Sequence, residues 1–196
     1  QNQLLCYEEL PSTNDLAKAL ANEGAPAGTV ITATAQSAGR GRLGRSFHAP
    51  KGLGIYLSVI LRPDCKPEQI MHLTCAAAEA MCDAVDACSG LRPQIKWTND
   101  LVINGKKLGG ILTELSVDPA TGKVDWVVVG IGINCRHTKQ DFPAELREIA
   151  TSLAMEGGDI LPGHLAGHMI QSLFRMSETL LTPAFEYIQA PQDAAA

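Results

Sequence analysis

The sequence has no long apolar run and no excess of positive charge. No stretch reaches the roughly 18 consecutive apolar residues that a membrane-spanning helix needs, and no basic segment followed by an apolar one marks a signal peptide. Sixteen Lys and Arg residues against 21 Asp and Glu give a net charge of -5, which argues against nucleic-acid binding through bulk positive charge. We expect a cytoplasmic protein that binds neither DNA nor membranes.

The cysteines form no CxxC pair. Their even number permits a disulfide framework, but such frameworks belong to shorter chains with smaller cores. Three of them fall in one expected helix, where small apolar side chains suit a core. We therefore interpret all six as buried thiols in a reducing compartment: Cys6, Cys65, Cys75, Cys82, Cys88 and Cys135.

Metal and thiol-catalysis motifs are incomplete. His164 and His168 have the spacing of a zinc pair on a helix, but the glutamate of an HExxH motif is missing and no third ligand suggests itself, so we expect an unliganded surface pair. Cys135 and His137 could form a thiolate and base, but residues two apart near the end of a strand do not favour that pairing. A structural cysteine is the prediction.

Common nucleotide motifs are also absent or misleading. Residues 39–44 match GxGxxG, but a dinucleotide fold needs a substantial helix before the next strand, and the stretch from Arg45 to Gly52 has only eight residues and contains Pro50. A phosphate loop ending in GK[ST] is missing altogether. Neither motif therefore predicts the function.

The 196 residues, of which 45% are hydrophobic, suffice for one packed core and show no repeat or linker. One domain over 1–196 is expected, with its core at about 5–181. Helix caps, β-branched runs and the turn dipeptide Asn104-Gly105 predict an α+β fold, a mixed sheet with flanking helices. The expected helices are 14–23, 67–88, 143–156 and 162–181, and the expected strands are 29–34, 53–61, 95–103, 107–117 and 126–133.

A local anion site is indicated between Glu23 and Asp64. These 40 residues contain no acid and carry +5, whereas the rest of the chain carries -10. Arg40, Arg42 and Arg45 alternate there with glycines, so planar guanidinium donors and exposed backbone N–H groups can bind one phosphate or carboxylate. The alternative is a solvated loop with incidental arginines.

A second polar group lies on the expected hairpin, in KWTNDL (96–101) and KKLGG (106–110). Asn99 and Asp100 could bond a nucleotide or hold a hydrated magnesium ion, and one lysine could neutralise a carboxylate or phosphate. The alternative, in which both residues form a turn and the lysines are solvated, stays open. Gly109 and Gly110 favour the functional interpretation slightly.

Four segments together resemble the biotin-[acetyl-CoA-carboxylase] ligase family: GRGRLGR (39–45), KWTNDL (96–101), KLGGIL (107–112) and GIGIN (130–134). The resemblance covers about residues 5–180. It implies a fold like the catalytic domain of class II aminoacyl-tRNA synthetases. It also implies a two-step reaction in which biotin and MgATP give biotinyl-5'-AMP and pyrophosphate, and a lysine of a biotin carboxyl carrier protein then takes the biotin.

The resemblance also implies residue roles. Arg40, Arg42 and Lys107 would be catalytic, with Lys107 on the biotin carboxylate. The implied biotin contacts are Ser12, Thr13, Gln36, Gly39, Arg40, Lys107, Gly110, Gly130 and Gly132. The implied ATP contacts are Arg42, Phe47, Asn99, Asp100 and Asn134, with Asp100 as a magnesium ligand.

Departures from the family pattern leave alternatives open. Thr98 replaces the usual proline and Phe47 replaces a frequent tryptophan. We expect neither an N-terminal helix-turn-helix domain nor the small C-terminal β-barrel domain of many relatives; a homodimer is possible. A lipoate or octanoate ligase or transferase shares the fold, and a biotin-binding or partner-binding module without turnover is the alternative from another class.

Overall fold

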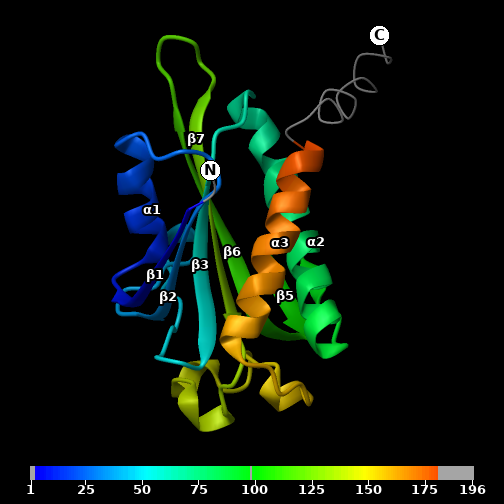
Figure 1. Cartoon of the computed structure of the whole chain (residues 1–196). Helices are drawn as coiled ribbons and strands as arrows, with labels where there is room; N and C mark the ends of the chain where they lie inside the picture. The colour runs from blue at the N-terminus through cyan, green and yellow to red at the C-terminus, as the bar shows by residue number, and fades with distance from the viewer. Residues whose placement is uncertain (1–2, 98, 181–196) are drawn as a thin grey trace.

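A seven-stranded mixed sheet organises the computed structural model, which describes residues 3–97 and 99–180 (Figure 1). The strand order is β1-β2-β3-β7-β6-β5-β4; β1 and β2 are parallel and the other neighbours are antiparallel. The strands are β1 (Gln3–Leu10), β2 (Thr29–Gln36), β3 (Gly54–Leu61), β4 (Gln94–Lys96), β5 (Asp100–Ile103), β6 (Lys106–Val117) and β7 (Val124–Asn134), and the helices are α1 (Thr13–Asn22), α2 (Ile70–Ser89) and α3 (Pro162–Leu180).

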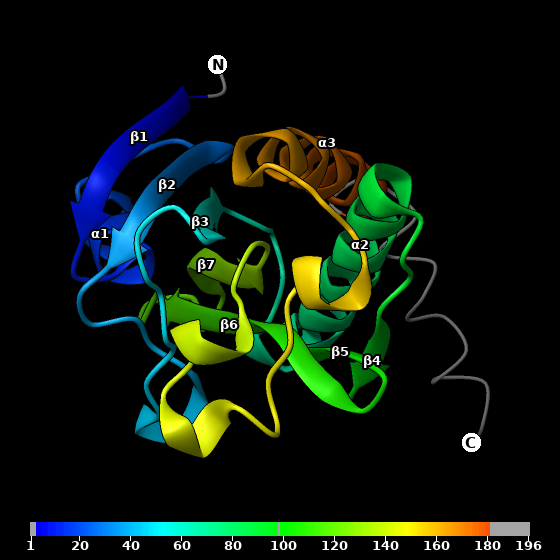
Figure 2. The ribbon, with the colours of Figure 1, turned by 90° about the horizontal axis from the view of Figure 1, so that it is seen from below.

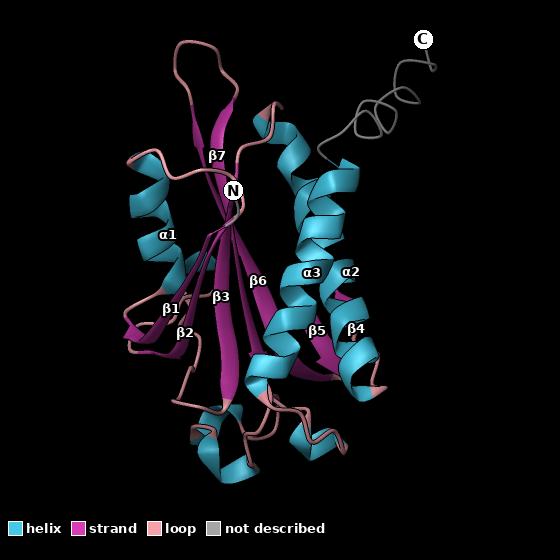
Figure 3. Cartoon of the chain, viewed as in Figure 1, coloured by secondary structure: helices cyan, strands magenta, loops and turns pink. Residues whose placement is uncertain are grey.

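Helices cover both faces of the sheet. Helix α1 lies on one face, and α2 and α3 lie side by side on the other, as two perpendicular views show (Figures 1 and 2). The secondary-structure colouring shows the strands gathered between these helices (Figure 3). None of the described helices is both long and apolar enough to cross a membrane.

Alternation along β7 divides its side chains between the two layers. Val127, Val129, Ile131 and Ile133 join the large core under α2 and α3, whereas Trp126 and Val128 pack in the smaller core under α1. Successive residues of a strand point to opposite faces, so Gly130 and Gly132 continue the α1 face. Toward the end of β7 the strand therefore contributes no side chain to that face.

Most of the expected elements are present with boundaries within a few residues. The turn at Asn104-Gly105 takes positive φ angles of 50° and 76° and joins β5 to β6 as predicted. The single strand expected over 95–103 is wrong, because β4 and β5 are separate and pair with each other through Lys96 and Asp100. Strand β1, an exposed edge strand parallel to β2, was not predicted.

The helix expected over 143–156 is wrong. Only two short 3₁₀ turns form there, Ala144–Leu146 and Ala154–Glu156. The backbone between them pairs with Lys107 instead: Lys107 N–H donates to the Ile149 carbonyl, and the Lys107 carbonyl accepts from Thr151 N–H, both at 2.8 Å. These long-range bonds replace the internal bonds of a helix. The expected end of the last helix, residue 181, lies outside the described residues.

The burial of the cysteines is only partly as expected. Cys65, Cys82 and Cys135 are buried, and burial raises the pKa of the Cys135 thiol to about 12, as suits a structural side chain. Cys75 and Cys88 are half-buried. Cys6 is exposed on β1, so the expectation of six buried thiols is wrong there.

Candidate active site

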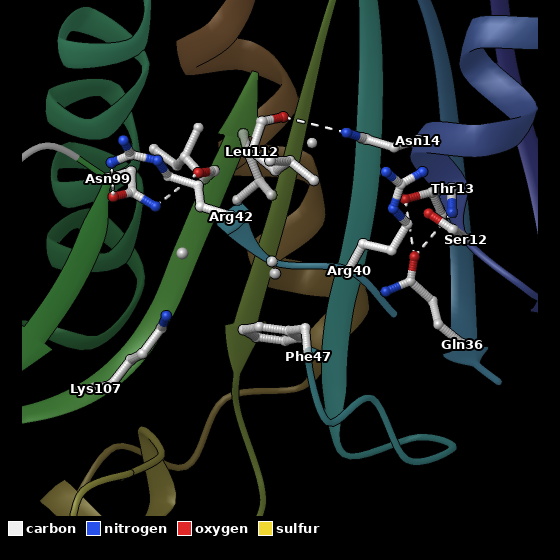
Figure 4. A pocket seen from close by; sticks show the side chains of 16 residues that line it. Ser12, Thr13, Asn14, Gln36, Arg40, Arg42, Phe47, Asn99, Lys107 and Leu112 are labelled. Atoms are coloured by element: carbon white, nitrogen blue, oxygen red, sulfur yellow. Dashed lines mark hydrogen bonds between the residues drawn. The ribbon is translucent and has the colours of Figure 1, made fainter. Parts of the chain in front are cut away.

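One cavity with about 470 Å³ of empty space, open mouth included, lies over the glycine end of β7. Its walls come from the start of α1, the loop after β2, the β4–β5 turn and β6 (Figure 4). The lining residues are Ser12, Thr13, Asn14, Gln36, Arg40, Gly41, Arg42, Phe47, Asn99, Lys107, Gly110, Ile111, Leu112, Gly130, Ile131 and Gly132.

The glycines form the floor of the cavity. A methyl group on Gly130 would overlap the Asn14 side chain, and one on Gly132 would lie 2.7 Å from Phe47 Cε1. Carbon atoms pack no closer than about 3.5 Å. Any larger side chain at either position would therefore displace a neighbour or fill the space that a ligand needs.

A buried polar network supports the α1 side. Gln36 Oε1 accepts hydrogen bonds from the Thr13 backbone N–H at 2.8 Å and from the Thr13 hydroxyl at 3.2 Å. Ser58 is fully buried on β3, and its hydroxyl lies 2.8 Å from Thr13 Oγ1 and 2.6 Å from Asn14 Oδ1, so its single proton is donated to one of these two oxygens at a time. Because buried polar groups held by several partners keep one orientation, these side chains are preorganised.

Ser12 does not cap α1 through its side chain, although its residue type suggested a cap; it is 3% exposed and lines the cavity. Two supporting residues are not among the predicted site residues. Asn14, near the start of α1, has an amide that donates to the Leu112 carbonyl at 3.2 Å and to Glu114 at 2.9 Å. Ser58 is the one polar residue in the apolar run of 53–61, which is the signal that could have identified it.

Arg40 and Arg42 occupy opposite ends of the cavity wall (Figure 4). Arg40 pairs with Asp15 at 2.5 Å and lies 3.5 Å from Glu114. Burial alone would raise the pKa of Asp15, but hydrogen bonds from Lys18 and Arg40 outweigh it and hold that pKa below its usual value. Residues 39–45, the arginine loop, are thus held next to α1 by the ion pair between Arg40 and Asp15.

Arg42 reaches toward the β4–β5 turn. Its Nη1 donates to Asn99 Oδ1 at 2.9 Å, while Asn99 Nδ2 donates to the Ile111 carbonyl at 3.1 Å. Asn99 therefore joins the arginine loop to β6. Sequence reasoning left a turn and a binding role open for Asn99, and the structure combines a turn position with a place on the cavity wall.

A β-bulge turns Lys107 toward the cavity. The pairs Leu101–Gly109 and Val102–Lys107 leave Leu108 opposite no residue of β5. One extra residue reverses the alternation of a strand. Lys107 therefore faces the same side as Gly110, whose added Cβ would lie 3.5 Å from Lys107 Nζ. Without the bulge, Lys106 would face the cavity.

Lys107 is held by a carboxylate. Its Nζ lies 2.8 Å from Asp100 Oδ1, and Asp100 itself pairs directly across the strands with Gly110. Both side chains are partly exposed, so an anionic ligand can reach the ammonium group without displacing a packed core. The arrangement places a cation beside the glycine floor and a carboxylate behind it.

Phe47 covers the floor from the loop side. Its ring meets Tyr56 edge to face, with centroids 6.3 Å apart, and lies over Gly132. Because Phe47 lines the cavity, its ring can stack with a planar ligand.

Three expected site residues do not line this cavity. Gly39 accepts a backbone hydrogen bond from Phe47 N–H at 2.8 Å and shapes the loop. Asp100 does not line the cavity itself but forms an ion pair with Lys107, which does. Asn134 was expected to face the nucleotide, but it is 4% exposed and donates to the Thr151 carbonyl at 3.0 Å. Its position at the buried end of β7 explains the departure. Thr98 lies outside the described residues.

Comparisons with known proteins identify the family of the chain. The model of the biotin/lipoate A/B protein ligase family matches residues 7–134. The bifunctional ligase/repressor BirA of Bacillus spizizenii is 45% identical over 158 residues, which cover 80% of this chain and 48% of that protein. The biotin-[acetyl-CoA-carboxylase] ligase of Mycobacterium tuberculosis is 36% identical over 77% of this chain and 54% of its own. The chain spans about half the length of these curated relatives.

Solved structures agree in fold. The biotin protein ligase of Aquifex aeolicus, in complex with biotin and ATP, superposes with a TM-score of 0.77 and 26% identity over 97% of this chain and 77% of its own. The biotin protein ligase of Leishmania major, in complex with biotinyl-5-AMP, gives a TM-score of 0.71 and 27% identity over 95% of this chain and 81% of its own. The mixed sheet with flanking helices is thus the fold of these ligases, and the chain belongs to the biotin/lipoate A/B protein ligase family.

Proposed function

We propose that the chain is the catalytic part of a biotin protein ligase. It activates biotin with ATP to biotinyl-5'-AMP and pyrophosphate, and then transfers biotin to a lysine of a biotin carboxyl carrier protein. The observation that carries the proposal is the convergence of Arg40, Arg42 and Lys107 on one glycine-floored cavity. Relatives whose structures hold biotin, ATP or biotinyl-5-AMP support the choice of ligand.

The first step joins two anions. A carboxylate oxygen of biotin attacks the α-phosphorus of ATP, a new C–O–P linkage forms, and the bond from that phosphorus to the bridging oxygen breaks as pyrophosphate leaves. Lys107 holds the carboxylate, while Arg40 and Arg42 face the acyl phosphate that forms between them. Fixed cations of this kind contribute mainly by positioning and by stabilising the charge that builds up in the transition state.

Biotin takes the end of the cavity near α1. Its uncharged ring system needs hydrogen-bond partners of fixed orientation, which Thr13 and Gln36 provide through the network described above, with Ser12 beside them on the cavity wall. Gly110, Gly130 and Gly132 leave room for the ligand. Gly39 belongs to this group through the shape that it gives to the loop.

The nucleotide takes the end near the β4–β5 turn. Phe47 offers a ring face for adenine, and Arg42 and Asn99 lie beside it on the wall. Asn134 supports this end from below through its bond to the Thr151 carbonyl. A purine stacked on an aromatic ring and fixed by a few polar groups is a common arrangement of nucleotide sites.

The residues present fit a magnesium ion that accompanies ATP. Such ions usually use one or two carboxylates together with phosphate oxygens and water. Asp100 offers one partly exposed carboxylate near the cavity, at 2.8 Å from Lys107 Nζ. The ion would neutralise charge on the phosphates when bound.

The second step releases AMP. The neutral amine of the carrier lysine attacks the acyl carbon, an amide C–N bond forms, the bond from carbon to the phosphate oxygen breaks, and the amine proton passes to solvent. The loop over 39–51 would order over the adenylate and exclude water until the carrier arrives. We also propose that the protein acts in the cytoplasm, does not bind DNA through this domain, and could form a homodimer.

Pyrophosphate release from MgATP tests the proposal. We expect release that depends on biotin and does not respond to lipoate, followed by labelling of a carrier domain but not of its Lys→Arg variant. Release with lipoate in place of biotin would identify a lipoate ligase. Biotin binding without pyrophosphate release would leave a binding module, and either result would overturn the proposal.

A further inference from the structure

Three metal-binding side chains meet on the helical face that is opposite the cavity. Cys88 lies in the last turn of α2, and His164 and His168 lie in the first two turns of α3. Their sulfur and nitrogen donor atoms are all within 4.8 Å of one another. Within residues 3–97 and 99–180, this is the one group of at least three His, Cys, Asp or Glu donors that is so arranged.

Packing fixes this geometry. Leu165 and Met169 are fully buried in the core between α3 and the sheet, which sets the rotation of α3. His164 and His168 each precede one of these residues, and residues four apart share a helix face. Helices α2 and α3 are in extensive contact, as Figure 2 also shows. The two imidazoles are therefore presented at the end of α2, where Cys88 lies.

We propose that Cys88, His164 and His168 bind a divalent transition-metal ion, most favourably Zn²⁺. One thiolate and two imidazoles are borderline-soft donors that suit this ion, and a water molecule can complete a tetrahedral set. The sequence alone gave only the histidine pair, because the third donor is 76 positions before His164 and comes close only through helix packing.

The donors need little movement to bind. Zinc bonds of about 2.0 Å to nitrogen and 2.3 Å to sulfur place tetrahedral donors roughly 3.3–3.6 Å apart. The proposal requires the present separations of up to 4.8 Å to shorten by rotation of side chains that are half-buried or exposed. Burial raises the pKa of the Cys88 thiol, so the metal-free group carries its proton, which passes to solvent when the thiolate binds the ion.

The competing explanation for the proximity of these side chains is a ring contact between the two histidines that involves no metal. The two imidazole rings meet edge to face, with centroids 5.2 Å apart and an interplanar angle of 78°. Such ring packing would need no third partner, and it gives no reason for a thiol within donor distance of both rings. The ion would cross-link α2 to α3 and act on folding. Because α1 and the cavity are on the other face of the sheet, the proposal does not depend on the ligase activity.

Titration of the metal-free chain with Co²⁺ and Zn²⁺ tests the site. We expect one equivalent of Co²⁺ to give the intense visible bands of tetrahedral coordination and a thiolate-to-cobalt absorption in the near ultraviolet. Zn²⁺ should displace the cobalt and raise the melting temperature. Cys88→Ser should abolish the thiolate band, and Cys88→Ser and His168→Gln should each weaken Zn²⁺ binding by at least about 10–100-fold.

Matched controls lie on the same helix. Cys75 and His72 are on α2, one half-buried and the other exposed, so Cys75→Ser and His72→Gln remove the same functional groups elsewhere. Both should bind Zn²⁺ like the unmodified chain, and all variants should keep biotin-dependent pyrophosphate release. Absence of stoichiometric binding, or equal affinity and thermal shift for Cys88→Ser and the unmodified chain, would overturn the proposal even if ligase activity is present.

Discussion

Lys107 is the residue on which the proposed chemistry can be tested most directly. Replacement by glutamine keeps a similar length and hydrogen-bonding ability but removes the positive charge. The change breaks the 2.8 Å ion pair with Asp100 and removes the cation that we propose to hold the biotin carboxylate. We predict a large loss of adenylation rate with little loss of stability.

The two effects differ in size for a structural reason. The side chains of Lys107 and Asp100 are 41% and 31% exposed, so solvent screens their attraction, and the loss of the pair should lower the free energy of unfolding by at most about 1 kcal/mol. In the transition state the same cation faces charge that builds up in a partly closed cavity. The loss of one such group typically costs about 2.7–4 kcal/mol, or roughly 100- to 1,000-fold in rate.

The assay is biotin-dependent pyrophosphate release under saturating MgATP, beside urea unfolding of each variant. Lys107→Arg retains the charge and should keep part of the rate. Lys106→Gln is the matched control, since the bulge at Leu108 turns Lys106 away from the cavity. A rate for Lys107→Gln within a few fold of the unmodified rate, or equal losses for both glutamine variants, would refute the reasoning.

Three further predictions concern the floor, the loop and the buried histidine. Gly132→Ala should weaken biotin binding about tenfold or more in a direct binding assay. Gly109→Ala, whose methyl would overlap the Gly132 carbonyl, should instead lower the free energy of unfolding in urea by roughly 1–3 kcal/mol. Weaker binding by Gly109→Ala and lower stability of Gly132→Ala would contradict the assignment of Gly132 to the cavity floor. Biotin with MgATP should slow trypsin cleavage in the loop over 39–51, and an unchanged rate would argue against its closure. Burial lowers the pKa of His137 to about 4 from its ordinary 6.5, so the unfolded state binds the proton more readily and stability should fall by up to about 3 kcal/mol as the pH drops from 6.5 to 4. His137→Phe should flatten that dependence in urea unfolding followed across this pH range.

Local patterns determined most of the sheet and the helices. Asn104-Gly105 predicts its turn because few other residues adopt positive φ at two successive positions, and the apolar run in β7 predicts a strand buried on both faces. The Arg40 and Arg42 loop is visible from the absence of acids around it. These features depend on neighbours in the sequence, so the sequence alone is sufficient to predict them.

Partners distant in the chain decided the rest. The segment over 143–156 has helical spacing, yet the backbone of Lys107 takes its hydrogen bonds. Long-range pairing also splits the strand expected over 95–103. Asn134 carries the right chemistry for a ligand, but the fold commits its amide to Thr151.

Orientation is the property that only the tertiary structure could supply. The family pattern indicates Lys107, but the β-bulge at Leu108 is what turns its side chain, rather than that of Lys106, toward the cavity. Cys88 gains two histidine neighbours because α2 packs on α3, not because of any spacing. A sequence specifies which chemical groups are present, whereas the register of strands and the rotation of helices determine which of them meet.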